Sequence, residues 1–186
     1  MFGFFKRLFA KNNAIAEDIA AVLDEENQKW CAMSTEELAA LPDDELLNAV
    51  NARIAAVIGD EEDETARIAL LNNEQRIIYV ADLYQAEVNN GGLCQYFVND
   101  SRFTAPMLCD ALATIGAEAH RMHFDVFIRD NAIDLTNLES FAINNIRQYA
   151  KMEKRYPFEA FDNAFYAMPS IEEPILAFIR THITKF

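Results

Sequence analysis

The central segment of this 186-residue chain reads Tyr84-Gln-Ala-Glu-Val-Asn-Asn-Gly-Gly-Leu-Cys-Gln-Tyr-Phe-Val-Asn99. Apolar residues recur at helical spacing before the Asn-Asn-Gly-Gly run, and Leu93, Tyr96 and Phe97 resume that spacing after it. Helices commonly end at such a run, because glycine adopts left-handed backbone angles without steric strain. The segment therefore predicts a helix, a tight turn at Gly91 and Gly92, and a second helix.

Helix start signals continue outward from this segment in both directions. Ser34-Thr-Glu-Glu37 and Thr136-Asn-Leu-Glu139 have the pattern of a capping box, in which a hydroxyl and a glutamate satisfy the first N–H groups of a helix. Thr104 and Ser170 are further N-cap candidates, and a break is expected near Asn72. The alternating pattern of a β-strand persists nowhere. The sequence predicts an all-α fold: a compact multi-helix domain with an acidic N-terminal helical extension.

Size and composition favour a folded protein with reduced thiols. The chain is 52% hydrophobic and has 14 phenylalanines, which is enough apolar material for a core. Its three cysteines, Cys31, Cys94 and Cys109, include no C-x-x-C pair, so they predict neither a disulfide framework nor a zinc site. No apolar run approaches the ~20 residues of a membrane span, and no signal peptide is recognised. A cytoplasmic location is expected.

The first eleven residues combine aromatic and basic side chains. Five large apolar residues are interleaved with Lys6, Arg7 and Lys11. A helix that lies on a membrane surface has this pattern, but so short a segment buries little area. A frayed end, or docking of its phenylalanines on the protein itself or on a neighbour, is the commoner outcome.

Negative charge is concentrated in the N-terminal third of the chain, whose net charge is −14. Residues 12–64 contain 15 acids and two bases, whereas residues 65–186 contain 15 acids and 11 bases. We therefore divide the chain into an acidic N-terminal helical extension, residues 1–64, and a helical domain, residues 65–186. Direct binding of nucleic acid is not expected, since it needs Lys and Arg to displace the counterions of the phosphates.

Carboxylates held on helices are the candidate partner-binding groups. Duplex DNA carries one charge per ~1.7 Å of its axis. Residues seven apart on a helix lie ~10.5 Å apart, so a row of acids would form a sparse version of that phosphate track. The candidate acidic face comprises Glu17, Asp24, Asp43, Asp44, Glu45, Asp60, Glu61, Glu62, Asp63 and Glu64. The alternative is that these acids only keep the surface solvated.

One motif in the helical domain resembles a known family. The chain carries Asn90-Gly91-Gly92-Leu93-x-Gln95-Tyr96-Phe97-x-Asn99, followed by Ala111-Leu112-x-x-Ile115-Gly116-Ala117. Over roughly Thr65 to Phe186 it resembles a bacterial family of small acidic helical proteins, most of which have Phe where this chain has Leu93. The characterised member of that family is a DNA mimic, which binds a DNA-binding regulator in place of duplex DNA.

The resemblance implies a helical fold and a partner that is a basic DNA-binding protein or another basic protein. The motif marks the fold and not the mimicry, because fold transfers between relatives better than activity does. A structural role is expected for Asn90, Gly91, Gly92, Gln95, Tyr96, Phe97 and Asn99.

Two alternatives stay open at this stage. One is an immunity or inhibitor protein against a basic toxin or nuclease, which the sequence does not separate from a DNA mimic. The other is an enzyme that uses Glu87 with His120 or His123, and two histidines on one helix face can also bind a metal. Against it, the full H-E-x-x-H spacing and every glycine-rich phosphate-binding pattern are absent. We predict no catalytic residue, no metal and no cofactor.

One basic stripe stands out in the helical domain: Arg147, Lys151, Lys154 and Arg155. It is either a solvated helix face or a surface that pairs with the acidic third, within the chain or across a homodimer. The whole sequence predicts a non-enzymatic interaction protein that occupies the basic surface of a DNA-binding protein.

Overall fold

The structure is a computed structural model that describes Leu23 and residues 25–186. These residues form helices and contain no strand, so the predicted all-α class is confirmed. They divide into two compact units, one that ends at Val57 and one that runs from Ile58 to Phe186. The aromatic and basic segment of residues 1–11 lies outside the described residues.

The first unit contains a helix over residues 25–32, α3 (Thr35–Ala39) and α4 (Asp43–Ile58). The predicted capping box opens α3: Ser34 Oγ accepts from the Glu37 N–H at 3.2 Å, and the Glu37 carboxylate accepts from the Ser34 N–H at 2.8 Å. Arg53 of α4 donates to the backbone oxygens of Trp30, at 2.9 Å, and of Met33. A cation is favoured there, because carbonyls at a helix C-terminus carry partial negative charge. Arg53 therefore fastens α4 to the chain that precedes α3.

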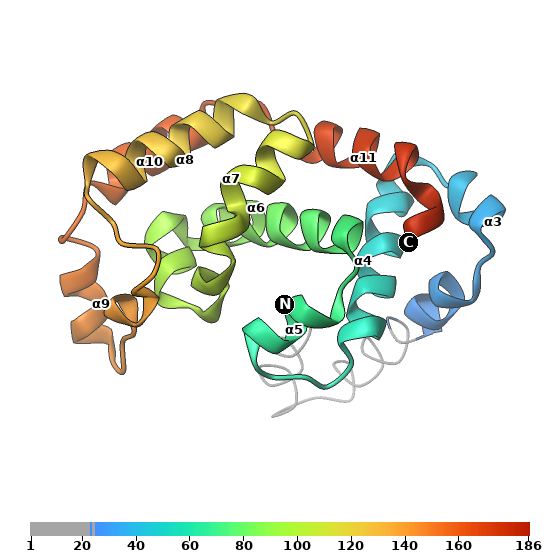
Figure 1. Ribbon diagram of the computed structural model, residues 1–186, viewed down its shortest axis with the longest axis horizontal. Coiled ribbons are helices and arrows are strands. Elements are labelled where there is room, and N and C mark those ends of the chain that lie inside the picture. Colours follow the sequence, from blue (N-terminus) through green and yellow to red (C-terminus); the bar gives the residue numbers. More distant parts are fainter. Residues whose placement is uncertain (1–22, 24) are drawn as a thin grey trace. The chain divides into compact units, whose positions relative to one another are not determined.

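The second unit is built around the long helix α6 (Asn73–Val98), drawn in green in Figure 1. Its other helices are α5 (Glu64–Leu70), α7 (Ala105–Thr114), α8 (Glu118–Asp130), α9 (Ile146–Met152), α10 (Phe158–Tyr166) and α11 (Glu172–Thr181). Three short 3-10 helices complete it: η1 (Asp100–Thr104), η2 (Leu138–Phe141) and η3 (Ile183–Lys185).

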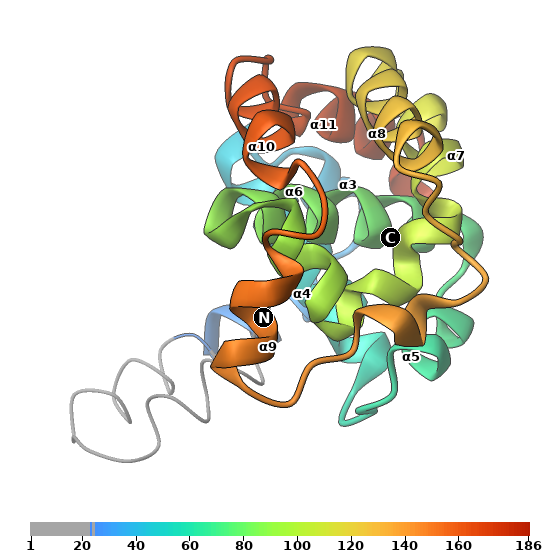
Figure 2. The same cartoon turned by 90° about the vertical axis from the view of Figure 1, so that its left-hand side faces the viewer.

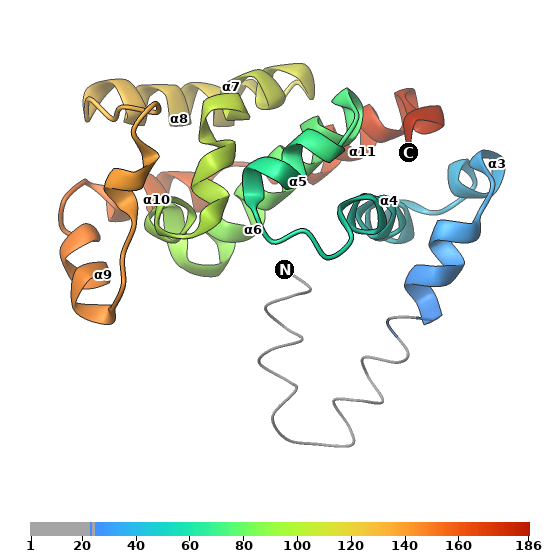
Figure 3. The same ribbon diagram turned by 60° about the horizontal axis from the view of Figure 1, so that its bottom comes forward.

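Packing in the second unit places α6 at its centre. Helices α7, α10 and α11 pack against α6, and α8 packs against both α7 and α10. Figure 2 shows α7, α8, α10 and α11 above α6 in that view. The short helix α9 lies at the end of the unit that is far from α11 (Figures 1 and 3).

A sharp corner separates α5 from α6, so the predicted break near Asn72 is confirmed. Leu71 has extended backbone angles. Asn72 accepts from the Gln75 N–H at 2.8 Å, and Gln75 accepts from the Asn72 N–H at 3.1 Å. This reciprocal cap satisfies N–H groups that have no partner inside the helix.

The helix α6 is itself interrupted at the Asn-Gly-Gly run, as the sequence predicts. Gly92 has φ 77° and ψ 175°, a region that is essentially restricted to glycine. The turn leaves the Leu93 N–H, at the start of the second half of α6, without a partner inside the helix. This N–H donates instead to Asp162 Oδ1 at 2.8 Å. A Cβ atom on Gly92 would lie 2.2 Å from Asp162 Oδ2. Glycine is therefore required both for the backbone conformation and for the approach of the carboxylate.

Aromatic rings from both halves of α6 form the core of the second unit. Tyr84 precedes the turn and Tyr96 follows it, and their rings meet edge to face at 5.6 Å. Phe97 stacks on Phe141 at 4.5 Å, and Phe124 of α8 contacts all three α6 rings. The fully buried aromatic side chains are Tyr84, Tyr96, Phe97, Phe124, Phe141 and Phe158. Because of the turn, one interrupted helix supplies three rings to a single cluster.

The predicted capping box at Thr136 is wrong. The Thr136 hydroxyl and N–H donate to Asp134 Oδ1 at 2.6 and 2.9 Å, so this residue belongs to a turn. Asp134 takes both donors because an aspartate readily bonds the backbone two residues later. The chain then forms η2, and α9 begins only at Ile146, capped by the side chain of Asn145.

The predicted cap at Thr104 is correct in position and wrong in chemistry. Thr104 occupies the N-cap of α7 without a side-chain cap bond. Its hydroxyl donates to the Ser101 backbone oxygen at 2.7 Å, so the Tyr96 hydroxyl, also at 2.7 Å, donates to it. A buried tyrosine hydroxyl needs a partner, and Thr104 supplies one. The hydroxyl of Ser170 accepts from the Glu172 N–H at 3.1 Å, although the N-cap position of α11 is one residue later.

The two motif glycines are expected to differ in their tolerance of alanine. Gly92→Ala places a Cβ at positive φ and displaces the Asp162 carboxylate, so we expect it to lower the unfolding free energy by about 2–4 kcal/mol. Gly91→Ala meets only the side chain of Gln95, whose amide oxygen would lie 2.1 Å and whose Cβ would lie 3.2 Å from the new Cβ, so a smaller loss of about 1 kcal/mol is expected. Urea unfolding of both variants, followed by circular dichroism, measures the difference. Equal losses would show that Gly92 is not specially constrained.

Candidate functional site

Three exposed acids at the start of α4 carry the predicted acidic face in the first unit. Asp43, Asp44 and Glu45 occupy the first turn of α4, and all three are exposed. Carboxylates are stabilised there, since a helix N-terminus carries partial positive charge. The described residues of this unit include seven acids and two bases, so its surface is strongly negative. Glu17 and Asp24, the other predicted acids of this part of the chain, lie outside the described residues.

The acidic run that opens the second unit is partly structural. Glu61 accepts from the Asp63 N–H at 2.9 Å, and Asp63 caps α5 by accepting from the Ala66 N–H at 2.8 Å. Asp60, Glu62 and Asp63 are exposed. Backbone N–H groups thus hold the carboxylates of Glu61 and Asp63 in place, and the run still presents negative charge to solvent.

Glu64 differs from the other predicted acids because it is buried, with 4% of its surface exposed. Its carboxylate accepts from the Tyr79 hydroxyl at 2.8 Å and pairs with Arg67 at 3.3 Å. Burial raises the pKa of Glu64, and the hydrogen bonds and the Arg67 charge oppose that shift only in part. Its contacts hold α5 against α6, and its carboxylate is turned away from solvent.

The polar residues of the Asn-Gly-Gly motif form a small network on α6. Glu87 Oε2 accepts from Gln95 Nε2 at 2.7 Å and from Asn99 Nδ2 at 3.0 Å. The network spans the turn, since Glu87 precedes the glycines and both amides follow them. It ties the two halves of α6 together, while Tyr96 and Phe97 are buried in the core and Asn90 is exposed.

The two histidines of α8 bond to backbone oxygens of other segments. His120 Nε2 lies 2.8 Å from the Pro169 oxygen, and His123 Nε2 lies 3.0 Å from the Phe161 oxygen. A carbonyl oxygen only accepts, so each Nε2 carries the proton. The His123 ring also stacks on Phe161 with centroids 4.0 Å apart. His123 thus connects α8 to α10, and His120 connects α8 to the segment that follows α10. Glu87, the other residue of the enzyme hypothesis, bonds Gln95 and Asn99 instead.

The sequence did not predict two hydrogen bonds between residues far apart in the chain. Asp162 accepts from the N–H of Leu93, which lies 69 residues earlier, and Tyr79 donates to the carboxylate of Glu64, which lies 15 residues earlier. No sequence pattern marks such pairs, because their spacing is set by how helices pack. A polar residue on the buried side of an aromatic helix is the only available signal for Asp162.

Two kinds of site are absent from residues 23 and 25–186. No three His, Cys, Asp or Glu side chains in that part of the chain come together as a metal site requires. Within the same residues, no helix has both the length and the hydropathy of a membrane span.

Burial of His120 predicts a pH-dependent stability. Burial lowers the pKa of His120, more than the hydrogen bond to Pro169 raises it. The unfolded chain then binds a proton near pH 6.5 that the folded protein takes up only at lower pH, so stability falls as the pH drops below about 6.5. We expect acidification from pH 7.5 to 5.5 to reduce the unfolding free energy of the wild type more than that of His120→Gln. Urea unfolding at both pH values measures this, and the difference is at most about 1.4 kcal/mol per pH unit. Parallel losses in the two proteins would contradict it.

Comparison with known proteins identifies a family. The model of the DMP19-like protein family matches residues 69–182, which is more than half of the chain and lies within the second unit. Comparison with curated proteins and with solved structures gives no match. The match covers α6 with its glycine turn, the aromatic core, and the helices α7 to α11. The chain therefore belongs to the DMP19-like protein family.

Proposed function

We propose that this protein is a DNA mimic that acts in the cytoplasm by occupying the basic surface of a DNA-binding protein. Membership of the DMP19-like family is the observation that carries the proposal. The net charge of −14 supports it, because a basic nucleic-acid-binding surface attracts any dense and fixed array of negative charge.

Rigid presentation of the acids supports the same role. Asp43, Asp44 and Glu45 stand on the first turn of a 16-residue helix, and Asp63 is fixed by its cap bond to α5. Carboxylates on such elements keep their spacing, as phosphates on a duplex do. A flexible acidic tail would lose conformational entropy on binding, whereas these residues are already ordered.

The residues of the enzyme alternative all have structural partners. Glu87 accepts two amide hydrogen bonds, and His120 and His123 each donate to a backbone oxygen. These bonds hold helices together and do not converge on a shared reaction centre. They support an interaction role, so no catalytic residue is assigned.

The partner is sought by capture from native cytoplasm on the immobilised protein, with identification by mass spectrometry. The proposal expects a basic DNA-binding protein whose complex with this protein is displaced by duplex DNA. A basic toxin or nuclease as the partner would favour an immunity role instead. A partner whose binding is unaffected by duplex DNA would contradict mimicry.

Neutralising exposed acids outside the family-matched region should slow association with that partner. We expect Asp44→Asn with Glu45→Gln to reduce the association rate roughly three- to tenfold at low salt, and much less at physiological salt, because screening weakens steering. Asp60→Asn with Glu62→Gln should act in the same direction. Stopped-flow or surface plasmon resonance at two salt concentrations measures both effects.

Glu153→Gln with Glu159→Gln is the matched control, since it also removes two exposed carboxylates but lies inside the family-matched region. A small effect of this control, beside a large effect of the other pairs, supports the acid-rich part of the chain as the binding surface. A larger effect of the control than of the other two pairs would place the binding surface in the family-matched region. An association rate that changes neither with salt nor in any of the three double variants would refute a charge-based mimic.

A further inference from the structure

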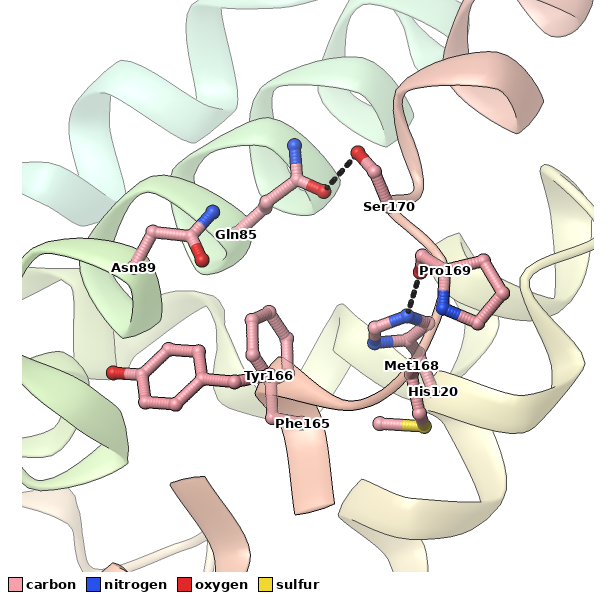
Figure 4. A pocket seen from close by; sticks show the side chains of 8 residues that line it. All are labelled: Gln85, Asn89, His120, Phe165, Tyr166, Met168, Pro169 and Ser170. Atoms are coloured by element: carbon pink, nitrogen blue, oxygen red, sulfur yellow. Dashed lines mark hydrogen bonds between the residues drawn. The ribbon is translucent and has the colours of Figure 1, made fainter. Parts of the chain in front are cut away.

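Two surface features of the second unit have no part in the proposed mimicry. One is a small pocket beside His120, whose walls come from α6, α8, α10 and the segment that follows α10 (Figure 4). Gln85 Oε1 at its edge accepts from the Ser170 hydroxyl at 3.0 Å and from the Ile171 N–H at 2.9 Å, and His120 bonds the Pro169 oxygen. These polar groups are therefore engaged within the protein. The other feature is the outer face of α9.

The outer face of α9 and of the turn after it carries a row of basic side chains. Arg147, Lys151 and Lys154 follow one another at spacings of four and three residues, which places them on one side of a helix. All three are exposed, and the neighbouring Arg155 is exposed as well. From residue 142 to residue 158 the chain has only these four bases and a single acid. Positive charge is thus concentrated here, on a protein whose net charge is −14.

The cations of this row lack a carboxylate partner. Four other arginines of the second unit each pair with a carboxylate: Arg67, Arg102, Arg121 and Arg129. By contrast, Arg147, Lys151 and Lys154 form no ion pair and no side-chain hydrogen bond with any described residue. The one nearby acid, Glu153, follows the half-buried Tyr149 by four residues, so it lies on the inner side of the helix.

An exposed isoleucine lies beside the basic row. Ile146 is 78% exposed, more than any other large apolar side chain in the described part of the chain. It lies one turn before Ala150, which is also exposed, so the two form a short apolar strip next to the cations. Met152 is the only buried residue of α9. This helix lies at the end of the second unit that is far from α11, and no other helix of that unit covers its outer face (Figures 1 and 3).

We propose that the outer face of α9 binds the surface of a membrane that contains anionic lipids. Each Lys or Arg close to such a surface strengthens binding roughly fivefold. Ile146 inserts among the headgroups, where an apolar side chain leaves water. Charges more than a Debye length away, about 8 Å at physiological salt, are largely screened, so distant acids of the same protein oppose this contact only weakly.

Two other anionic partners fit this face less well. A specific protein complex buries about 800 Å² on each partner and is centred on large, often aromatic side chains, whereas this face offers one isoleucine. A nucleic acid would supply phosphates but no apolar environment for Ile146. A lipid surface satisfies both the cations and the isoleucine. The face uses none of the predicted acids, so the proposal does not depend on the proposed mimicry.

Flotation of the full chain with lipid vesicles tests the proposal. Vesicles of mixed phosphatidylglycerol and phosphatidylcholine are compared with vesicles of phosphatidylcholine alone. We expect the protein to bind only the anionic vesicles, and less at physiological salt than at low salt, because salt screens the attraction. Lys151→Gln with Lys154→Gln should lower the partition coefficient roughly 25-fold at low salt, about fivefold for each cation. Lys151→Arg with Lys154→Arg should bind as the wild type does.

Arg121→Gln with Arg129→Gln is the matched control. It removes two cations of the same unit and gives the same net charge, but both arginines pair with carboxylates on α8. It should change binding much less than the lysine pair. Ile146→Asn should weaken binding roughly fivefold at low and physiological salt alike, because burial of an apolar side chain is not screened. All these residues lie on the surface, and circular dichroism checks that each variant is folded.

Three outcomes would overturn the proposal. The first is an absence of binding to anionic vesicles at low salt. The second is an equal loss in the lysine pair and in the arginine control, which would show that only net charge matters. The third is wild-type binding by the lysine pair, together with a loss in Lys6→Gln with Arg7→Gln, which would assign the contact to the aromatic and basic segment of residues 1–11.

Discussion

The second unit depends on one hydrogen bond, from the Leu93 N–H to the carboxylate of Asp162. A helix that restarts after a turn exposes N–H groups without partners, and burying them unpaired is unfavourable. Asp162 satisfies one of them from α10, and Gly92 makes the approach possible because it has no Cβ and tolerates φ 77°. The same contact thus fixes the bend of α6 and the position of α10. It also lets Tyr84 and Tyr96 face one another in the core.

The acidic residues of this protein serve two different purposes. Some have structural tasks in the fold: Glu37 and Asp63 cap helices, Glu87 bridges the turn of α6, and Glu64 is buried against Tyr79. Others, such as Asp44 and Glu45, are exposed on a regular helix. Net charge does not distinguish the two groups. A mimic of DNA depends on the second group, because only exposed charge attracts a partner at a distance.

Family membership and charge point to different parts of the chain. The family match covers residues 69–182, which contain 15 acids and nine bases, while most of the excess acid precedes it. The family match therefore explains the fold of the second unit better than it explains a binding surface. Fold and activity are separable in this way because a partner reads surface side chains, whereas the family pattern reflects packing and turns.

Local features were determined by the sequence alone. The capping box at Ser34, the break at Asn72 and the turn at Gly92 follow from residues within a few positions of one another, and the structure contains all three. The box expected at Thr136 failed for an equally local reason, since Asp134 stands two residues earlier. The acid-rich region was evident from composition, because charge needs no fold to be counted.

Tertiary structure alone decided which polar groups are buried and with what partner. The burial of Glu64 against Tyr79, the pairing of Thr104 with Tyr96, the cap from Asp162 and the neutral form of His120 all depend on helices that meet in space. Sequence does not reveal such pairs, because a hydrogen bond acts over about 3 Å while the separation of its partners along the chain is set by packing. The pocket beside His120 was not predictable from the sequence for the same reason, because its walls come from α6, α8, α10 and the segment that follows α10.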